Sequence, residues 1–253
     1  MTVTSHRKGS SDSWTSGSEP SQCVCSSGGG SCWLRTACAN AGGVRLRWPG
    51  GPADTALELA LCLTMIMKRM VLRFNERRAT EAAARFLKLR GNRMSYLKLI
   101  KLLYLLDREA LLRWGRPVTT DRYFSMDNGP VVSRIYDLIR EEPAPGTDPV
   151  WHHYISTPQG WEVVLIAEPE PAELSRAEEG LIDEIYAKHG KMNRWDLVRL
   201  SHDLPEWQDP NGGAIPIQYR DILRAGNKTE TEIAAVEAEL ESLAAAEAML
   251  QPA

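Results

Sequence analysis

The sequence predicts a mainly α-helical domain with a small β component (α+β), packed compactly around one central hydrophobic helix. Three observations lead to this prediction. Helical apolar periodicity with capping signals recurs over residues 75–225, short β-like runs lie between the helical segments, and residues 95–113 are apolar over most of their surface. The 253 residues allow one such domain with appendages, and the 43% hydrophobic and 25% charged fractions are ordinary for a globular protein.

Each helix is predicted from apolar residues at helical spacing and from residues that favour a helix start or stop. Gly91 ends the first segment, Ser175 and Glu178 form a capping box, and Asn193 caps the segment that follows. The predicted helices are residues 75–90, 95–113, 130–139, 175–189, 193–202, a last core helix through Tyr219, Ile222 and Leu223, and residues 229–250.

The second of these helices is the most apolar, and we expect it to lie at the centre of the core. Its apolar arc is broad, while Lys98 and Lys101 fall on the opposite, more polar side. Asp107 is out of place, because it falls in the middle of the apolar arc. A buried carboxylate is costly unless it is paired. We therefore expect Asp107 to contact backbone N–H groups or a basic side chain, with Arg122 and Arg134 as candidates.

The segment after this helix favours a short extended run followed by a turn. Residues 121–127 are predicted to be extended, and Asn128, Gly129 and Pro130 form a turn signal. Proline is well suited to the first position of a helix, where its missing N–H costs nothing. We therefore predict that the next helix starts at Pro130.

A second β-like region follows a proline-rich loop. Residues 150–155 and 161–167 are rich in β-branched and aromatic side chains, and a five-residue connection with proline and glycine joins them. This pattern predicts a β-hairpin.

Composition divides the chain into three parts. The predicted parts are a disordered low-complexity leader (1–69), the helical domain (70–227) and a C-terminal Ala/Glu-rich helix (228–253). The leader holds all five cysteines, but their spacing does not match a zinc site. Three methionines, Met65, Met67 and Met70, stand just before the domain pattern, so we interpret residues 1–66 as an upstream extension that precedes the true start.

Signals of catalysis or of a bound cofactor are missing from the sequence. It contains no nucleophile elbow, P-loop, dinucleotide-binding glycine motif or zinc-protease motif, and the predicted domain has no cysteine nucleophile. The net charge of −3 gives no overall basic field that would attract nucleic acid or anionic lipid. We therefore expect a protein that is not an enzyme and that holds no cofactor or metal.

Three segments, in order along the chain, form a family pattern. They are KLLYLLDR (101–108) with GRPV (115–118), NGPV (128–131) with Tyr136, and Ser201-His202 with LPEW (204–207). Together they resemble the Panacea domain, also called the SocA-like antitoxin domain, over residues 75–225.

The resemblance implies the function of an antitoxin in a bacterial or prophage-associated toxin–antitoxin system. Such a protein neutralises a partner toxin in the cytoplasm by binding it, and one branch of the family is thought to hand its toxin to a ClpXP-type protease. The implied partners are therefore a cognate protein toxin and a ClpXP-type protease, with no membrane and no nucleic acid.

Seven residues are candidates for partner binding. They are Lys98, Lys101, Tyr104, Asn128, Gly129, Pro130 and Trp207. Each also has a structural interpretation: the lysines as a solvated helix face, Tyr104 as a core ring, and Trp207 as a cap on the core. Asp107 is expected to be a structural buried polar residue. We expect Trp207→Ala or a charge reversal at Lys101 to weaken partner binding more than folding.

Two other functions compete with this interpretation. A nucleic-acid-associated regulator or phage accessory protein would use a basic surface of Lys98, Lys101, Arg108, Arg113 and Arg116. An unrecognised hydrolase would use His152 or His202 with nearby acidic residues.

Overall fold

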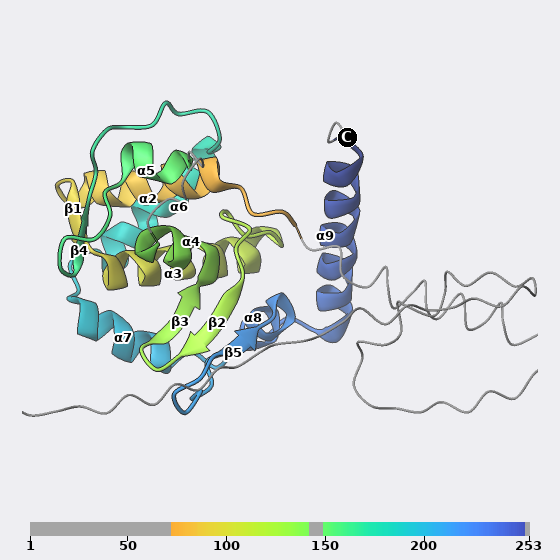
Figure 1. Ribbon diagram of the computed structural model, residues 1–253. Coiled ribbons are helices and arrows are strands. Elements are labelled where there is room, and N and C mark those ends of the chain that lie inside the picture. Colours follow the sequence, from red (N-terminus) through yellow and green to blue (C-terminus); the bar gives the residue numbers. More distant parts are fainter. Residues whose placement is uncertain (1–71, 142–148, 251–253) are drawn as a thin grey trace, which may run out of the picture. The chain divides into compact units, whose positions relative to one another are not determined.

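The computed structural model describes residues 72–141 and 149–250, which all belong to one unit of the chain (Figure 1). The helices within these residues are α2 (Glu76–Arg90), α3 (Tyr96–Trp114), α4 (Ser133–Arg140), α5 (Val150–Tyr154), α6 (Arg176–His189), α7 (Arg194–His202), α8 (Tyr219–Ala225) and α9 (Glu230–Leu250). The strands are β1 (Arg93–Ser95), β2 (Tyr123–Met126), β3 (Gly129–Val132), β4 (Glu162–Val164) and β5 (Ile215–Ile217). The predicted α+β class is confirmed.

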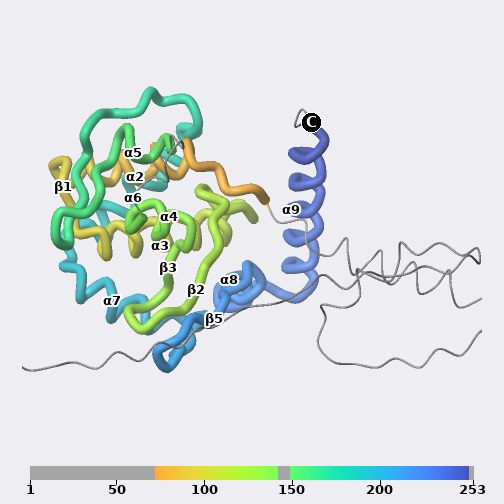
Figure 2. Tube along the Cα trace, in the orientation of Figure 1, coloured from red at the N-terminus to blue at the C-terminus, as the bar shows by residue number. Residues whose placement is uncertain are grey.

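The central position predicted for the most apolar helix is also confirmed. Helix α3 packs against α2, α6, α7, α8 and strand β3 (Figure 2). Because neighbours cover it on several sides, its residues from Lys98 to Asp107 are all buried, polar and apolar alike. The buried apolar residues of this helix pack with residues such as Phe86, Ile135 and Trp151 into one continuous core.

The strands form two small antiparallel sheets. Strand β1 pairs with β4, with Met94 opposite Val163. The second sheet has the order β3-β2-β5, in which Phe124 of the central strand lies opposite Val131 on one side and Pro216 on the other. Strands β2 and β3 form a hairpin whose turn is Asp127 and Asn128. The sequence prediction missed β5.

Local capping signals explain several helix ends, as predicted. Asn75 Oδ1 accepts a hydrogen bond from Arg78 N at the start of α2, and Gly91 ends that helix with φ of 94°. The Ser175–Glu178 capping box opens α6, and Asn193 accepts bonds from two backbone N–H groups at the start of α7. Ser95 stands at the N-cap position of α3, but its side chain makes no capping bond.

The predicted helix start at Pro130 is wrong. Pro130 lies in strand β3 at the edge of its sheet, where a missing N–H is tolerated. Helix α4 starts at Ser133, because the carboxylate of Asp121 accepts hydrogen bonds from Arg134 N (2.9 Å) and Ile135 N (3.0 Å). A side chain twelve or more residues away thus fixes the helix start.

The hairpin predicted for 150–155 and 161–167 is also wrong in its first half. Val150–Tyr154 is a short helix, and Trp151 is fully buried within it. The backbone N–H of Trp151 donates to Glu76 Oε1 at 2.9 Å, so the start of α2 holds this segment. Strand β4 pairs with β1, and the antiparallel bridges Ile155–Leu165 and Gln159–Glu162 remain from the predicted hairpin.

The C-terminal helix is present as predicted and docks by one edge. Thr229 and Glu232 cap α9, and its buried residues are Ile233, Leu240 and Ala244. It packs against α8.

The predictions for the leader (1–69), including its cysteines and start site, lie outside the described residues. Among the residues that the structure describes, no helix is long and apolar enough to cross a membrane.

Candidate functional site

Helix α3 contacts two segments that are distant from it in the sequence. The Nζ of Lys101 in α3 donates to the carbonyl oxygen of Pro130 in β3 at 2.6 Å. The hydroxyl of Tyr104 donates to Glu206 Oε1 at 3.0 Å, and Trp207 Nε1 donates to the carbonyl oxygen of Met126 at 3.2 Å. The helix, the β2–β3 hairpin and the loop after α7 therefore form one connected site.

Lys101 is buried, contrary to the interpretation of its side of α3 as solvated. Its side chain is 1% exposed, and burial lowers the pKa of its ammonium to about 7. Lys98 is buried as well and donates to the carbonyl oxygens of Gly190 (2.6 Å) and Met192 (2.7 Å) after α6. Burial, followed by the charge of Arg90, lowers the pKa of Lys98. Both lysines link α3 to other segments.

Tyr104 is a core residue whose hydroxyl belongs to a buried polar triad. Glu206 accepts hydrogen bonds from Tyr104 (3.0 Å) and from Arg108 Nε (2.6 Å), and its side chain is fully buried. Desolvation, followed by the charge of Glu206, raises the pKa of Tyr104. Glu206 belongs to the family segment LPEW, but its burial was not predicted from the sequence, because it lies in an irregular loop without a periodic apolar pattern.

Position 129 requires glycine for two reasons, its backbone conformation and the lack of room for a side chain. Its φ of 87° lies in the left-handed region that side chains with a Cβ rarely adopt. A Cβ at this position would collide with Ser201 Oγ and would stand 3.0 Å from Lys101 Nζ. The close approach of the hairpin to both α3 and α7 thus depends on a residue without a side chain.

The outer side of this site is a small surface, which we call the hairpin-tip surface: Met126, Asp127, Asn128, His202 and Trp207. The rings of His202 and Trp207 stack with centroids 4.2 Å apart and an interplanar angle of 23°. His202 Nε2 lies 3.1 Å from the carbonyl oxygen of Asp127, and Asn128 is exposed at the turn. Figure 1 shows the β2–β3 turn beside the end of α7. Trp207 is half-buried.

Asp107 is satisfied by backbone N–H groups, one of the two environments that the sequence predicts. Its carboxylate accepts from Val118 N (2.9 Å), Thr119 N (2.8 Å), the Thr119 hydroxyl and the Tyr123 hydroxyl (3.0 Å). The alternative partners Arg122 and Arg134 are exposed, and within the described residues neither forms an ion pair with Asp107. Desolvation raises the pKa of Asp107 to about 6, although its hydrogen bonds act in the opposite direction.

The raised pKa predicts a pH-dependent stability. A carboxyl whose pKa rises on folding binds its proton more readily in the folded state, so stability increases as the pH falls through that range. From pH 7 to pH 5, the wild type should gain about 1 kcal/mol of unfolding free energy relative to Asp107→Asn. Urea denaturation of both proteins at the two pH values measures this. A difference that stays constant or shrinks would show that the four donors outweigh desolvation.

The histidines offer little support for a hydrolytic or metal centre. Residues 152 and 153 are consecutive in α5, and the ring of His202 packs against Trp207. Among the described residues, no group of three or more His, Cys, Asp or Glu side chains is placed to hold a metal ion.

Comparison with known proteins gives one match. Residues 99–208 match the family model described as "Antitoxin SocA-like, Panacea domain", which confirms the resemblance seen in the sequence. The matched region begins in α3 and ends one residue after Trp207, so it contains all three segments of the site. No curated protein and no solved structure matches the chain.

Proposed function

We propose that this chain, whose residues 99–208 match the SocA-like Panacea antitoxin family, is an antitoxin that neutralises a protein toxin by binding it through the hairpin-tip surface. The observation that supports this proposal most is the meeting of all three family segments beneath that surface. The family description itself indicates an antitoxin-like domain and a protein partner. The identity of the surface and its use against a toxin are our proposal.

The seven candidate residues divide into two groups by burial. Lys98, Lys101 and Tyr104 are buried, as are Gly129 and Pro130, so they position the hairpin and the loop rather than contact the toxin. Asn128 is exposed and Trp207 is half-buried, so neither is enclosed in the core as the other five are. Tryptophan is enriched among residues that dominate binding energy. We therefore assign the toxin contact to these two residues.

The basic surface that a nucleic-acid regulator would need does not form as predicted. Lys98 and Lys101 are buried. Arg108 pairs with Glu206, and Arg113 pairs with Glu109 and Glu184, each with an N–O distance of 2.6 Å. Of the five predicted basic residues, Arg116 alone remains exposed without an ion pair among the described residues. These five residues therefore do not form the basic surface that the nucleic-acid interpretation requires.

A role as proteolytic adaptor extends the proposal. In one branch of the family that the chain resembles, the antitoxin hands its toxin to a ClpXP-type protease, and we propose the same role for this chain in the cytoplasm. Purified ClpXP should then degrade the toxin quickly only when this chain is added. Equal degradation with and without the chain would leave neutralisation by binding as the whole mechanism.

Trp207→Ala is expected to abolish neutralisation while leaving the fold intact. The proposal predicts that a short reading frame beside this gene encodes the toxin. Co-expression should restore growth with the wild type but not with Trp207→Ala, and binding should weaken by about tenfold or more. The lost ring stacking should shift the melting temperature by only a few degrees.

Trp161→Ala is the matched control for this experiment. Trp161 is 64% exposed and stacks on Tyr96, far along the chain from the hairpin-tip surface. Its replacement should leave growth rescue unchanged. If Trp161→Ala abolishes rescue and Trp207→Ala does not, the binding surface lies elsewhere on the domain.

A further inference from the structure

A second hollow, separate from the hairpin-tip surface, is lined by arginines. It has a volume of about 840 Å³ and lies where the segment before α2 approaches the start of α4 and the end of α9. Figure 1 shows the segment that leads into α2 running toward α9. We call it the arginine hollow, after Arg73, Arg77, Arg122 and Arg134.

These four arginines have no ion-pair partner within residues 72–141 and 149–250. All four are exposed, and each of the salt bridges in that part of the chain involves other residues. Two acidic residues also line the hollow, but Glu76 accepts a hydrogen bond from Trp151 N, and Glu247 stands near the end of α9. The hollow therefore has an excess of positive charge.

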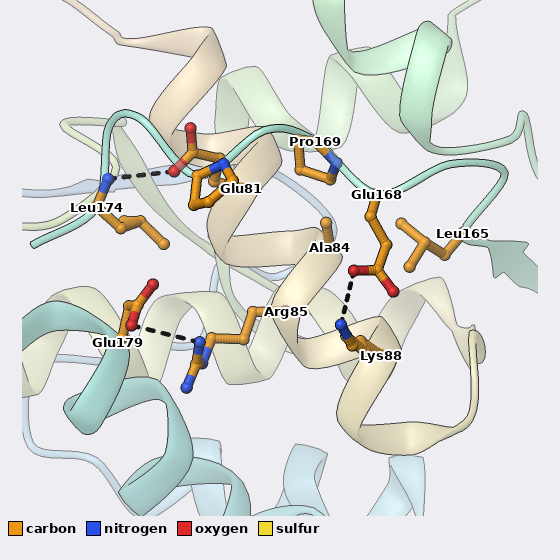
Figure 3. Close-up of a pocket in the computed structure, with 10 residues that line it drawn as sticks. Glu81, Ala84, Arg85, Lys88, Leu165, Glu168, Pro169, Leu174 and Glu179 are labelled. Carbon is orange, nitrogen blue, oxygen red and sulfur yellow. Dashed lines mark hydrogen bonds and ion pairs between the residues drawn. The ribbon is translucent and has the colours of Figure 1, made fainter. Parts of the chain in front are cut away.

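In a smaller hollow on the same domain, the charged side chains already have partners within the protein (Figure 3). There, Lys88 pairs with Glu168 at 2.6 Å, and Arg85 pairs with Glu179 at 3.6 Å. The carboxylate of Glu81 accepts backbone N–H groups, including that of Leu174 at 3.1 Å. Its cations and anions neutralise one another, so it offers no unpaired charge to a ligand. The arginine hollow differs in this respect.

The backbone beneath three of the arginines is held by two neighbouring residues. Thr120, with a φ of 55°, donates from its hydroxyl to the carbonyl oxygen of Arg73 at 2.7 Å. The carboxylate of Asp121 accepts from Arg122 N at 2.6 Å and from Arg134 N at 2.9 Å. Segments that are distant in sequence thus present their arginines from a common framework.

We propose that the arginine hollow binds a compact ligand that has two or more phosphate groups. Guanidinium groups match phosphate oxygens with paired hydrogen bonds, and a polyphosphate concentrates several negative charges in a small volume. An extended acidic peptide would spread the same charge over a longer path than one hollow provides. Four apolar residues, Leu72, Phe74, Val150 and Leu250, also line the hollow and can contact an organic group attached to the phosphates.

Calorimetric titration with sodium tripolyphosphate at low ionic strength tests this proposal. The double variant Arg122→Ala/Arg134→Ala should bind it roughly tenfold more weakly or worse, because each charged hydrogen bond is strong. The backbone bonds to Asp121 survive in this variant, so the fold should be retained. If circular dichroism shows that this variant has lost its fold, the double variant Arg73→Ala/Arg77→Ala is used in its place. Adenosine triphosphate as a second probe distinguishes phosphate esters, which should bind more tightly through the apolar lining, from inorganic polyphosphate.

Arg116→Ala is the control, since it removes an exposed arginine outside the hollow. It should change the affinity by less than twofold. The proposal is overturned if the wild type binds neither probe, if Arg116→Ala weakens binding as much as the double variant does, or if a glutamate-rich peptide alone binds. None of these results bears on growth rescue through Trp207, so the two proposals can fail separately.

Discussion

Gly129→Val is expected to lower the free energy of unfolding by at least about 3 kcal/mol. Two costs contribute to this loss. A β-branched residue is strained at φ of 87°, and its Cβ would collide with Ser201 Oγ and press on Lys101 Nζ. The hairpin would have to move away from α3 and α7 to relieve the collision. Chemical denaturation monitored by circular dichroism measures the loss.

Gly160→Val separates the two costs. Gly160 also has a positive φ, 67°, but a Cβ there would have no heavy atom within 4 Å. In this variant the free energy of unfolding should therefore fall only by the cost of the strained backbone, about 1–3 kcal/mol. Equal losses at the two glycines would mean that the close approach of the hairpin to Ser201 and Lys101 is not a tight contact.

Lys101→Glu is expected to destabilise the protein by about 3–5 kcal/mol. The substitution places a carboxylate in a buried position where the neighbouring group is the carbonyl oxygen of Pro130, so both partners would be acceptors. From the sequence alone, charge reversal here is expected to weaken partner binding more than folding. Burial of Lys101 reverses that order. Urea denaturation measures the change directly.

Lys101→Met is the matched control, because methionine keeps most of the length of the side chain and introduces no charge. It leaves the carbonyl of Pro130 without its donor, which costs about 1–3 kcal/mol. The loss should therefore be smaller than for Lys101→Glu. If the two variants are equally stable, the Lys101 side chain reaches solvent and does not hold the hairpin as described.

The sequence predicted those parts of the fold that local signals determine. Gly91, Asn193 and the Ser175–Glu178 pair fixed helix ends that the structure confirms, and the apolar composition of α3 placed it in the core. The segment 150–154 was mispredicted because its β-like composition is overridden by burial of Trp151 against α2. The start of α4 was misplaced because the residue that caps it, Asp121, is distant in the chain.

The candidate site was only partly predictable for a related reason. Lys98 and Lys101 look like a solvated face on a helical wheel, but α3 has neighbours on several sides, so its polar side chains donate to carbonyl groups of other segments. The resemblance to a family indicated Tyr104, Gly129 and Trp207 without showing that they meet. Their contact depends on tertiary packing, which no local pattern encodes.

The most direct test of partner binding at the hairpin-tip surface is hydrogen exchange on the full chain, alone and with the toxin that the proposal expects a neighbouring gene to encode. Backbone amides of residues 125–130 and 202–209 should exchange more slowly in the complex, while those of α9 should not change. Protection confined to α9, or to the β1–β4 sheet, with no change at these two segments would contradict the account.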